Sequence, residues 1–173
     1  MPLLAILIPL AALQASAPTY RGFFPGMPYR AFAEQARSLA VQDVLRCNTS
    51  ANTAQLMECG VAIRDPSDNA RFYLSAYVIE GRVVMLSFGD SGDVRLVARL
   101  QQELKRRFGP AHAVGHNSWE WRNPGAVQPA SGEHRVVRLS WRGRGAMRWI
   151  YVNMADYELM NAIRHYARPA AAQ

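Results

Sequence analysis

The sequence predicts an α+β fold in which a single antiparallel sheet of about six strands carries its helices on one face. Apolar residues recur at helical spacing in three segments and alternate with polar residues in several shorter ones. Short hairpin turns join most of the shorter segments, and hairpins cannot supply the crossovers that a parallel sheet requires. Half of the 173 residues are hydrophobic and 19% are charged, a balance typical of a packed domain rather than a disordered chain.

The first half of the chain is expected to begin with a helix near Pro28, because Phe32 and Ala36 follow it at helical spacing. A polar stretch between the two cysteines then leads to a short apolar strand at residues 60–63. Residues 65–71 are rich in Asp, Asn, Ser and Pro, so they predict a turn.

A hairpin is expected next, with strands at residues 72–79 and 82–88. Glu80 and Gly81 form its two-residue loop, since glycine readily adopts the positive φ that such loops need.

The second half opens with the clearest helix of the chain. Asp93 or Ser91 caps its first turn, and Gly109 followed by Pro110 ends it. Its apolar positions recur at helical spacing and are Leu96, Val97, Leu100, Leu104 and Phe108.

Three further strands and a last helix complete the expected order. A strand at residues 118–122 is followed by a hairpin with strands at 136–141 and 147–153. Asp156 then caps a helix that carries Leu159, Met160 and Ile163 at helical spacing. Residues 27–88 and 93–153 therefore share the order helix, strand, strand, strand, which predicts a structural pseudo-repeat although their sequences are not alike.

The amino terminus is typical of an export signal. Residues 1–17 are apolar and uncharged, and they end in Ala-Ser-Ala, the small-residue pattern of a signal-peptidase site. The apolar run is shorter than the ~20 residues of a membrane-spanning helix. We expect a signal peptide at 1–17, one domain at 18–168 and a disordered tail at 169–173. Because no Lys or Arg precedes the apolar run, an uncleaved membrane anchor is the alternative to a periplasmic or secreted protein.

The two cysteines, Cys47 and Cys59, are an even pair in a chain with an expected export signal, which predicts a disulfide bond. A metal site would need further ligands, and no histidine lies near the pair in the sequence. On the chain-entropy model, closing a loop of this length stabilises the fold by about 3 kcal/mol.

Several short motifs together resemble a known group of exported two-layer domains. They are the segment 23–27 (Phe-Phe-Pro-Gly-Met), the cysteine pair, a Glu-Gly-Arg-Val hairpin, the helix end at 107–110 (Arg-Phe-Gly-Pro) and a tryptophan-bearing strand. The chain thereby resembles the β-lactamase-inhibitor proteins and the outer-membrane-assembly lipoproteins of BamE-like type. The resemblance implies a binding or assembly role rather than catalysis. This chain lacks the lipid-anchor cysteine of the lipoproteins, and no inhibitory residue is carried over.

The segment Gly89-Asp90-Ser91-Gly92 shares its letters with the nucleophile motifs of serine proteases and esterases. In the protease order the histidine and aspartate precede the serine, whereas every histidine here follows Ser91. We expect a turn whose Asp and Ser side chains cap the next helix, and keep a small serine hydrolase using Ser91 as an alternative. His112 and His116 lie four residues apart but follow a helix end, so no metal site is assigned.

Basic residues and tryptophans gather in the carboxyl-terminal strands. The chain has a net charge of +7, and six arginines lie within residues 122–148. On a strand, alternate side chains share a face, so Val137, Leu139 and Trp141 should pack on the helices while Arg138 and Arg142 point outward. The candidate binding surface comprises Trp119, Trp121, Arg122, Arg138, Trp141, Arg142, Arg144, Arg148 and Trp149. The alternative is a solvated outer face with the tryptophans in the core.

These observations predict a non-enzymatic, exported domain that binds a protein partner or an anionic component of the cell envelope. No cofactor is assigned. The chain has no zinc-finger spacing, helix-turn-helix pattern or stacked-aromatic RNA-binding consensus, which argues against nucleic acid as the partner. A structural subunit of a membrane complex, held by an uncleaved amino-terminal helix, is the further alternative. The oligomeric state is left open.

Overall fold

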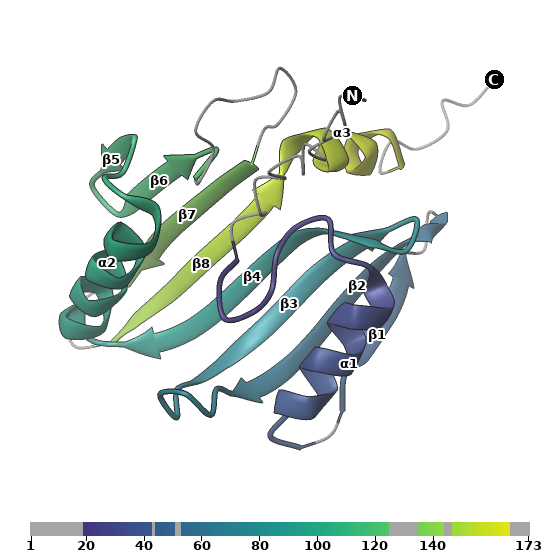
Figure 1. The fold of residues 1–173 in the computed structure, drawn as a ribbon, viewed down its shortest axis with the longest axis horizontal. Coiled ribbons are helices and arrows are strands. Elements are labelled where there is room, and N and C mark those ends of the chain that lie inside the picture. The colour runs from purple at the N-terminus through teal and green to yellow at the C-terminus, as the bar shows by residue number, and fades with distance from the viewer. Residues whose placement is uncertain (1–18, 43, 51–52, 125–134, 144–146, 167–173) are drawn as a thin grey trace, which may run out of the picture.

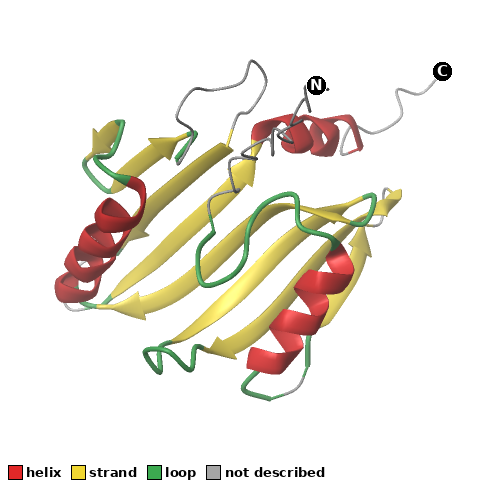
Figure 2. Ribbon diagram, viewed as in Figure 1, coloured by secondary structure: helices red, strands yellow, loops and turns green. Residues whose placement is uncertain are grey.

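The computed structural model describes residues 19–42, 44–50, 53–124, 135–143 and 147–166, with residues 50, 53–55 and 162–166 described by their backbone alone. The expected signal peptide and carboxyl-terminal tail lie outside these ranges, as does Arg144. Within them the chain forms three helices and eight strands (Figures 1 and 2). The helices are α1 (Tyr29–Leu39), α2 (Val94–Phe108) and α3 (Tyr157–Tyr166). The strands are β1 (Arg46–Ser50), β2 (Thr53–Arg64), β3 (Arg71–Ile79), β4 (Arg82–Gly92), β5 (Ala113–Gly115), β6 (Ser118–Arg122), β7 (Arg135–Arg142) and β8 (Arg148–Asp156).

The described strands form one antiparallel sheet in the order β1-β2-β3-β4-β8-β7-β6-β5. The predicted α+β class and single antiparallel sheet are therefore confirmed. Each of the first two helices is followed by a four-stranded meander, and the two meanders meet where β4 pairs with β8. The sheet has eight strands rather than about six, because the sequence-based assignment missed the outermost strand of each meander. β1 is polar and β5 is only three residues long, so neither carries an alternating apolar pattern.

One face of the sheet is covered by α1, α2 and the chain that precedes α1. The two helices lie over opposite halves of the sheet, and residues 19–28 run between them across its middle (Figure 1). Backbone hydrogen bonds from Gly26 N to Val83 O and from Val83 N to Met27 O fix this segment to β4. The sequence marked residues 20–26 only as irregular chain before the first helix, but they fill the space between the helices.

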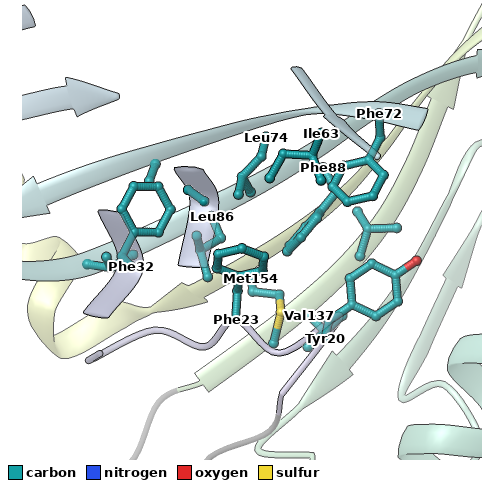
Figure 3. Packing of buried hydrophobic residues seen from close by; sticks show 14 of the residues in the cluster. Tyr20, Phe23, Phe32, Ile63, Phe72, Leu74, Leu86, Phe88, Val137 and Met154 are labelled. Carbon is teal, nitrogen blue, oxygen red and sulfur yellow. The ribbon is translucent and has the colours of Figure 1, made fainter. Parts of the chain in front are cut away.

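The centre of the core is aromatic. Tyr20 and Phe23 of the amino-terminal segment are almost completely buried, and both rings contact Phe88 of β4 edge-on, with centroids 4.9 and 6.1 Å apart (Figure 3). Phe72 of β3 packs on the same ring at 5.6 Å. Edge-to-face contacts of this kind favour aromatic clusters beyond the area that they bury.

Local signals in the sequence set the ends of α2 and of the central hairpin. The carboxylate of Asp93 accepts hydrogen bonds from the backbone N–H groups of Arg95 and Leu96, which confirms it as the cap of α2. Gly109 ends the helix with a φ of +81°. Glu80 and Gly81, both at positive φ, form the expected loop between β3 and β4.

Two local expectations are corrected. The predicted capping turn at residues 89–92 is the end of β4, whose pairing with β8 continues to Gly92, and Asp93 alone caps α2. The polar stretch after Cys47 is not a loop but the β1–β2 hairpin, and β2 is much longer than residues 60–63. Cross-strand pairing of Cys47 with Cys59 places the two sulfurs beside each other, and the predicted disulfide is confirmed. Tertiary pairing therefore overrides the polar composition of this stretch.

α3 follows β8 and contacts the ends of β2, β3, β4 and β8. The carboxylate of Asp156 accepts hydrogen bonds from the N–H groups of Glu158 and Leu159, so it caps this helix as predicted. None of the helices in the described ranges is long and apolar enough to cross a membrane.

Candidate functional site on the open face of the sheet

In the described part of the chain, α1, α2 and residues 19–28 all lie on one face of the sheet (Figure 1), and we call the opposite face the open face. Its side chains follow from the strand alternation and register. Two large aromatic side chains stand out on it, since Tyr73 is 55% exposed and Trp149 is 57% exposed. Residues of the open face on the middle strands include Glu58, Gly60, Ala62, Arg64, Arg71, Tyr73, Ser75, Tyr77, Ser87, Gly89, Ser91, Trp149, Tyr151, Asn153, Arg138, Ser140 and Arg142.

The structure divides the predicted tryptophans between the two faces. Trp121 is fully buried on the covered face and donates a hydrogen bond to the carbonyl oxygen of Gly109, so its assignment to a binding surface is wrong. Trp119 and Trp141 lie on the same covered face and pack against the core. Trp149 alone among the four points to the open face, because its position on β8 has the opposite parity to Ile150, which is buried.

The predicted arginines are also divided. Arg138 and Arg142 lie on the open face, as the alternation of β7 predicts, and Arg122 lies on its continuation over β6. Arg148 has the same parity on β8 as the buried Ile150, so it lies on the covered face rather than on the open face with Arg138 and Arg142. Arg142 is placed beside an aromatic ring, with its guanidinium 5.6 Å from the centroid of Tyr151.

Glu120 neutralises part of this charge. Its Oε1 accepts one hydrogen bond from Arg122, and its Oε2 accepts two from Arg138. These bonds, first from Arg122 and then from Arg138, hold the pKa of the Glu120 carboxyl below its usual range. Arg142 has no carboxylate partner among the described residues, so positive charge extends beyond this cluster.

A hollow of about 630 Å³ lies on the middle strands of the open face, toward the end where β3 begins and β4 ends, and we call it the Gly89 notch. Gly89 sits on the central strand β4, directly between Tyr73 on β3 and Tyr151 on β8. Because Gly89 has no side chain, it leaves a gap in the row of side chains between Tyr73 and Tyr151. The residues of the open face that line the notch are Ala62, Arg71, Tyr73, Ser75, Ser87, Gly89, Ser91, Trp149 and Tyr151.

The notch presents polar groups without partners inside the protein. The hydroxyls of Ser75, Ser87 and Ser91 make no hydrogen bond to another described residue, and Arg71 has no ion-pair partner there. Asp90 lies at the margin, and burial raises the pKa of its carboxyl, while its Oδ1 accepts a hydrogen bond from the Ser91 N–H. Hydroxyls and a guanidinium are therefore available to a ligand beside three aromatic rings.

Sequence reasoning missed Tyr73, Tyr151 and Gly89. Tyr73 and Tyr151 lie on predicted strands. Each is next to a buried residue, Leu74 or Ile150, so strand alternation alone predicts that both tyrosines face outward. The register that aligns them with Gly89 on either side depends on the pairing of β4 with β8, which no local signal fixes.

A second hollow, of about 810 Å³, lies beside α2 at the end of β3 and β4. Among the described residues, four arginines line it, Arg21, Arg71, Arg99 and Arg106. Arg21 already binds two carboxylates, those of Asp65 and Asp68. The same guanidinium lies over the rings of Tyr20 and Phe72, at 5.4 and 5.0 Å from their centroids. Arg21 thus fixes the β2–β3 turn to the core through these contacts.

The Ser91 motif lies in an extended strand and not in a strand-to-helix elbow. In the described part of the chain, no histidine is hydrogen-bonded to its hydroxyl, and the Nδ1 of His112 accepts the N–H of Arg122. The described residues also contain no group of three or more His, Cys, Asp or Glu side chains arranged to hold a metal ion.

Comparison of the chain with protein-family models, with curated proteins and with solved structures gives no match.

Proposed function

We propose that this protein is an exported, non-enzymatic binding protein whose open face recognises a protein partner or an anionic component of the cell envelope. The observation that carries the proposal is the exposure of Trp149 and Tyr73 on either side of the Gly89 notch. Large exposed aromatic side chains that gather around a hollow are typical of interaction sites. Arginine beside aromatic rings is the combination enriched in such sites.

The charge of the open face favours a partner with negative groups. By alternation and register, its arginines over β1–β3 and β6–β7 are Arg46, Arg64, Arg71, Arg122, Arg138 and Arg142, against Glu58 and Glu120. Planar guanidinium groups bind phosphate and carboxylate through paired hydrogen bonds. The resemblance to exported inhibitor and assembly domains points in the same direction, toward binding rather than catalysis.

In-cell photo-crosslinking tests the proposal. A photoreactive amino acid replaces Trp149 on the open face or, as a control, Val94, which is 59% exposed at the start of α2. We expect adducts from position 149 and not from position 94. Equal labelling from both positions, or no adduct from position 149, would contradict the proposal.

Two further measurements test its details. Binding to an anionic partner should weaken with added salt and with removal of charge at Arg138 and Arg142 on the open face. The intact mass of the native protein distinguishes a cleaved signal at residues 1–17 from a retained anchor.

A further inference from the structure

We infer that the Gly89 notch binds a sugar ring of an acidic glycan chain, whose negative groups contact the arginines beside the notch. This inference rests on the proposed function and deepens it by naming the chemistry of the ligand. The shape of the notch, its lining and the charge around it support the inference.

The shape comes from one missing side chain on β4, between the Tyr151 ring and the backbone of Tyr73. A β-carbon added to Gly89 would lie 3.5 Å from Cε1 of Tyr151 and 3.7 Å from the carbonyl oxygen of Tyr73, both ordinary contact distances. A group seated on Gly89 therefore touches the Tyr151 ring on one side and the Tyr73 backbone on the other without displacing either. The hydroxyl end of Tyr73 lies over Gly60 on β2, so the Tyr73 ring lies along the sheet toward β2.

The lining matches a sugar ring more closely than an aliphatic anchor of a protein. One face of a pyranose consists of C–H groups and its rim consists of hydroxyls. Tyr73, Tyr151 and Trp149 offer ring faces to the C–H groups. The Ser75, Ser87 and Ser91 hydroxyls offer donors and acceptors to the rim, and an aliphatic anchor would bury them without partners.

The charge selects for an acidic glycan. Arg71 lines the notch, and Arg142 lies next to its wall, where its Nη2 donates to the Tyr151 hydroxyl at 3.4 Å. Neither arginine forms an ion pair within the described part of the chain. A second copy of this chain would bring like charges together, which argues against a dimer through this face.

Binding of a heparin hexasaccharide tests the inference, with maltohexaose as the neutral probe and a tryptophan-containing oligoglutamate peptide as the protein-like probe. We expect the hexasaccharide to bind, and maltohexaose and the peptide to bind at least 10-fold more weakly in isothermal titration calorimetry at one fixed salt concentration.

Variants separate stacking in the notch from general attraction of charge. Gly89→Leu fills the notch and Trp149→Ala removes a wall, and each should weaken hexasaccharide binding about 10-fold. Arg142→Ala should also weaken hexasaccharide binding. Arg99→Ala removes the same charge on α2, outside the notch, and should change the affinity for the hexasaccharide less than 2-fold. Trp149→Ala and the smaller Gly89→Ala keep the test valid if Gly89→Leu lowers stability.

Three outcomes would overturn the inference. The first is that the hexasaccharide does not bind, and the second is that the acidic peptide binds as tightly as the hexasaccharide. The third is that Arg99→Ala and Arg142→Ala lose the same affinity for the hexasaccharide while Trp149→Ala loses none. If position 149 still crosslinks to a protein in cells, the proposed function survives while the glycan inference fails. If neither crosslinking nor glycan binding is seen, both fail.

Discussion

The indole Nε1 of Trp121 donates a hydrogen bond of 2.9 Å to the carbonyl oxygen of Gly109. This bond links β6 to the residue that ends α2, and the Trp121 ring lies between Phe108 and Trp119, with centroids 6.5 and 6.1 Å away. One tryptophan of the carboxyl-terminal strands thereby anchors a helix, while Trp149 faces outward. Substitutions of Trp121 and of Trp149 should therefore differ in their effect on stability.

Trp121→Ala should lower the free energy of unfolding by about 3–5 kcal/mol, because it empties a large buried site. Trp121→Phe should cost about 1 kcal/mol or more, since the Gly109 carbonyl loses its donor. Trp149→Ala should stay within about 0.5 kcal/mol of the wild type, because the side chain is exposed. Urea denaturation of the three variants measures these values, and an equal loss in Trp121→Ala and Trp149→Ala would contradict the assignment of the two faces.

Acid should weaken the fold through the Arg21 cluster. Burial opposes ionisation of Asp65, but hydrogen bonds from Ser67 and Arg21 hold its pKa below the usual range. The hydrogen bond from Arg21 also lowers the pKa of Asp68. A carboxyl whose pKa is lowered by folding stabilises the protein above its unfolded pKa of about 3.9, and this contribution disappears as the pH falls through the folded pKa.

Arg21→Met should therefore cost about 3 kcal/mol at pH 7, and its difference from the wild type should narrow below about pH 4. Arg30→Met is the matched control, because the Arg30–Glu34 pair is exposed and should contribute less than about 0.5 kcal/mol. Urea titrations at a series of pH values measure both. A difference between Arg21→Met and the wild type that is independent of pH would show that these carboxyls do not respond to Arg21.

Reduction of the Cys47–Cys59 bond should lower the free energy of unfolding by about 3 kcal/mol. The double variant Cys47→Ala/Cys59→Ala should show a similar loss, and added reductant should then have no further effect. Non-reducing peptide mass spectrometry checks that the bond is present in the native protein. Two free thiols there would remove one of the two supports for an exported compartment.

Glu120→Gln should strengthen binding of an acidic ligand, because Arg122 and Arg138 lose the carboxylate that they share. We expect an increase of about 3-fold in affinity for the heparin hexasaccharide at low salt and little difference at high salt. Stability should change by less than about 1 kcal/mol, since both arginines are substantially exposed. Weaker binding by Glu120→Gln would show that the carboxylate positions these arginines for the ligand.

Sequence patterns were sufficient for those elements that carry their own signals. Asp93, Gly109 and the Glu80–Gly81 loop act within a few residues of chain, so the ends of α2 and the β3–β4 hairpin were predictable. β1 was missed because it is stabilised by pairing with β2 and by the disulfide rather than by its own composition.

For the candidate site, the alternation of β7 correctly separated Arg138 from Val137 and Leu139. Alternation cannot identify the face of β6 that meets α2, so Trp121 was assigned to the surface. The notch was missed because Tyr73, Gly89 and Tyr151 come from three strands and meet only through their register.

By itself, the sequence determined the α+β class, the antiparallel hairpins, the helix caps and the disulfide pair, because each depends on short-range chemistry or on cysteine count. Only the tertiary structure decided that residues 19–28 fill the core, that Trp149 rather than Trp121 faces outward, and that a glycine between two tyrosines opens a notch. These features depend on which strands pair and which sheet face the helices bury. Contacts between distant residues set both, and a local pattern of polar and apolar side chains does not encode them.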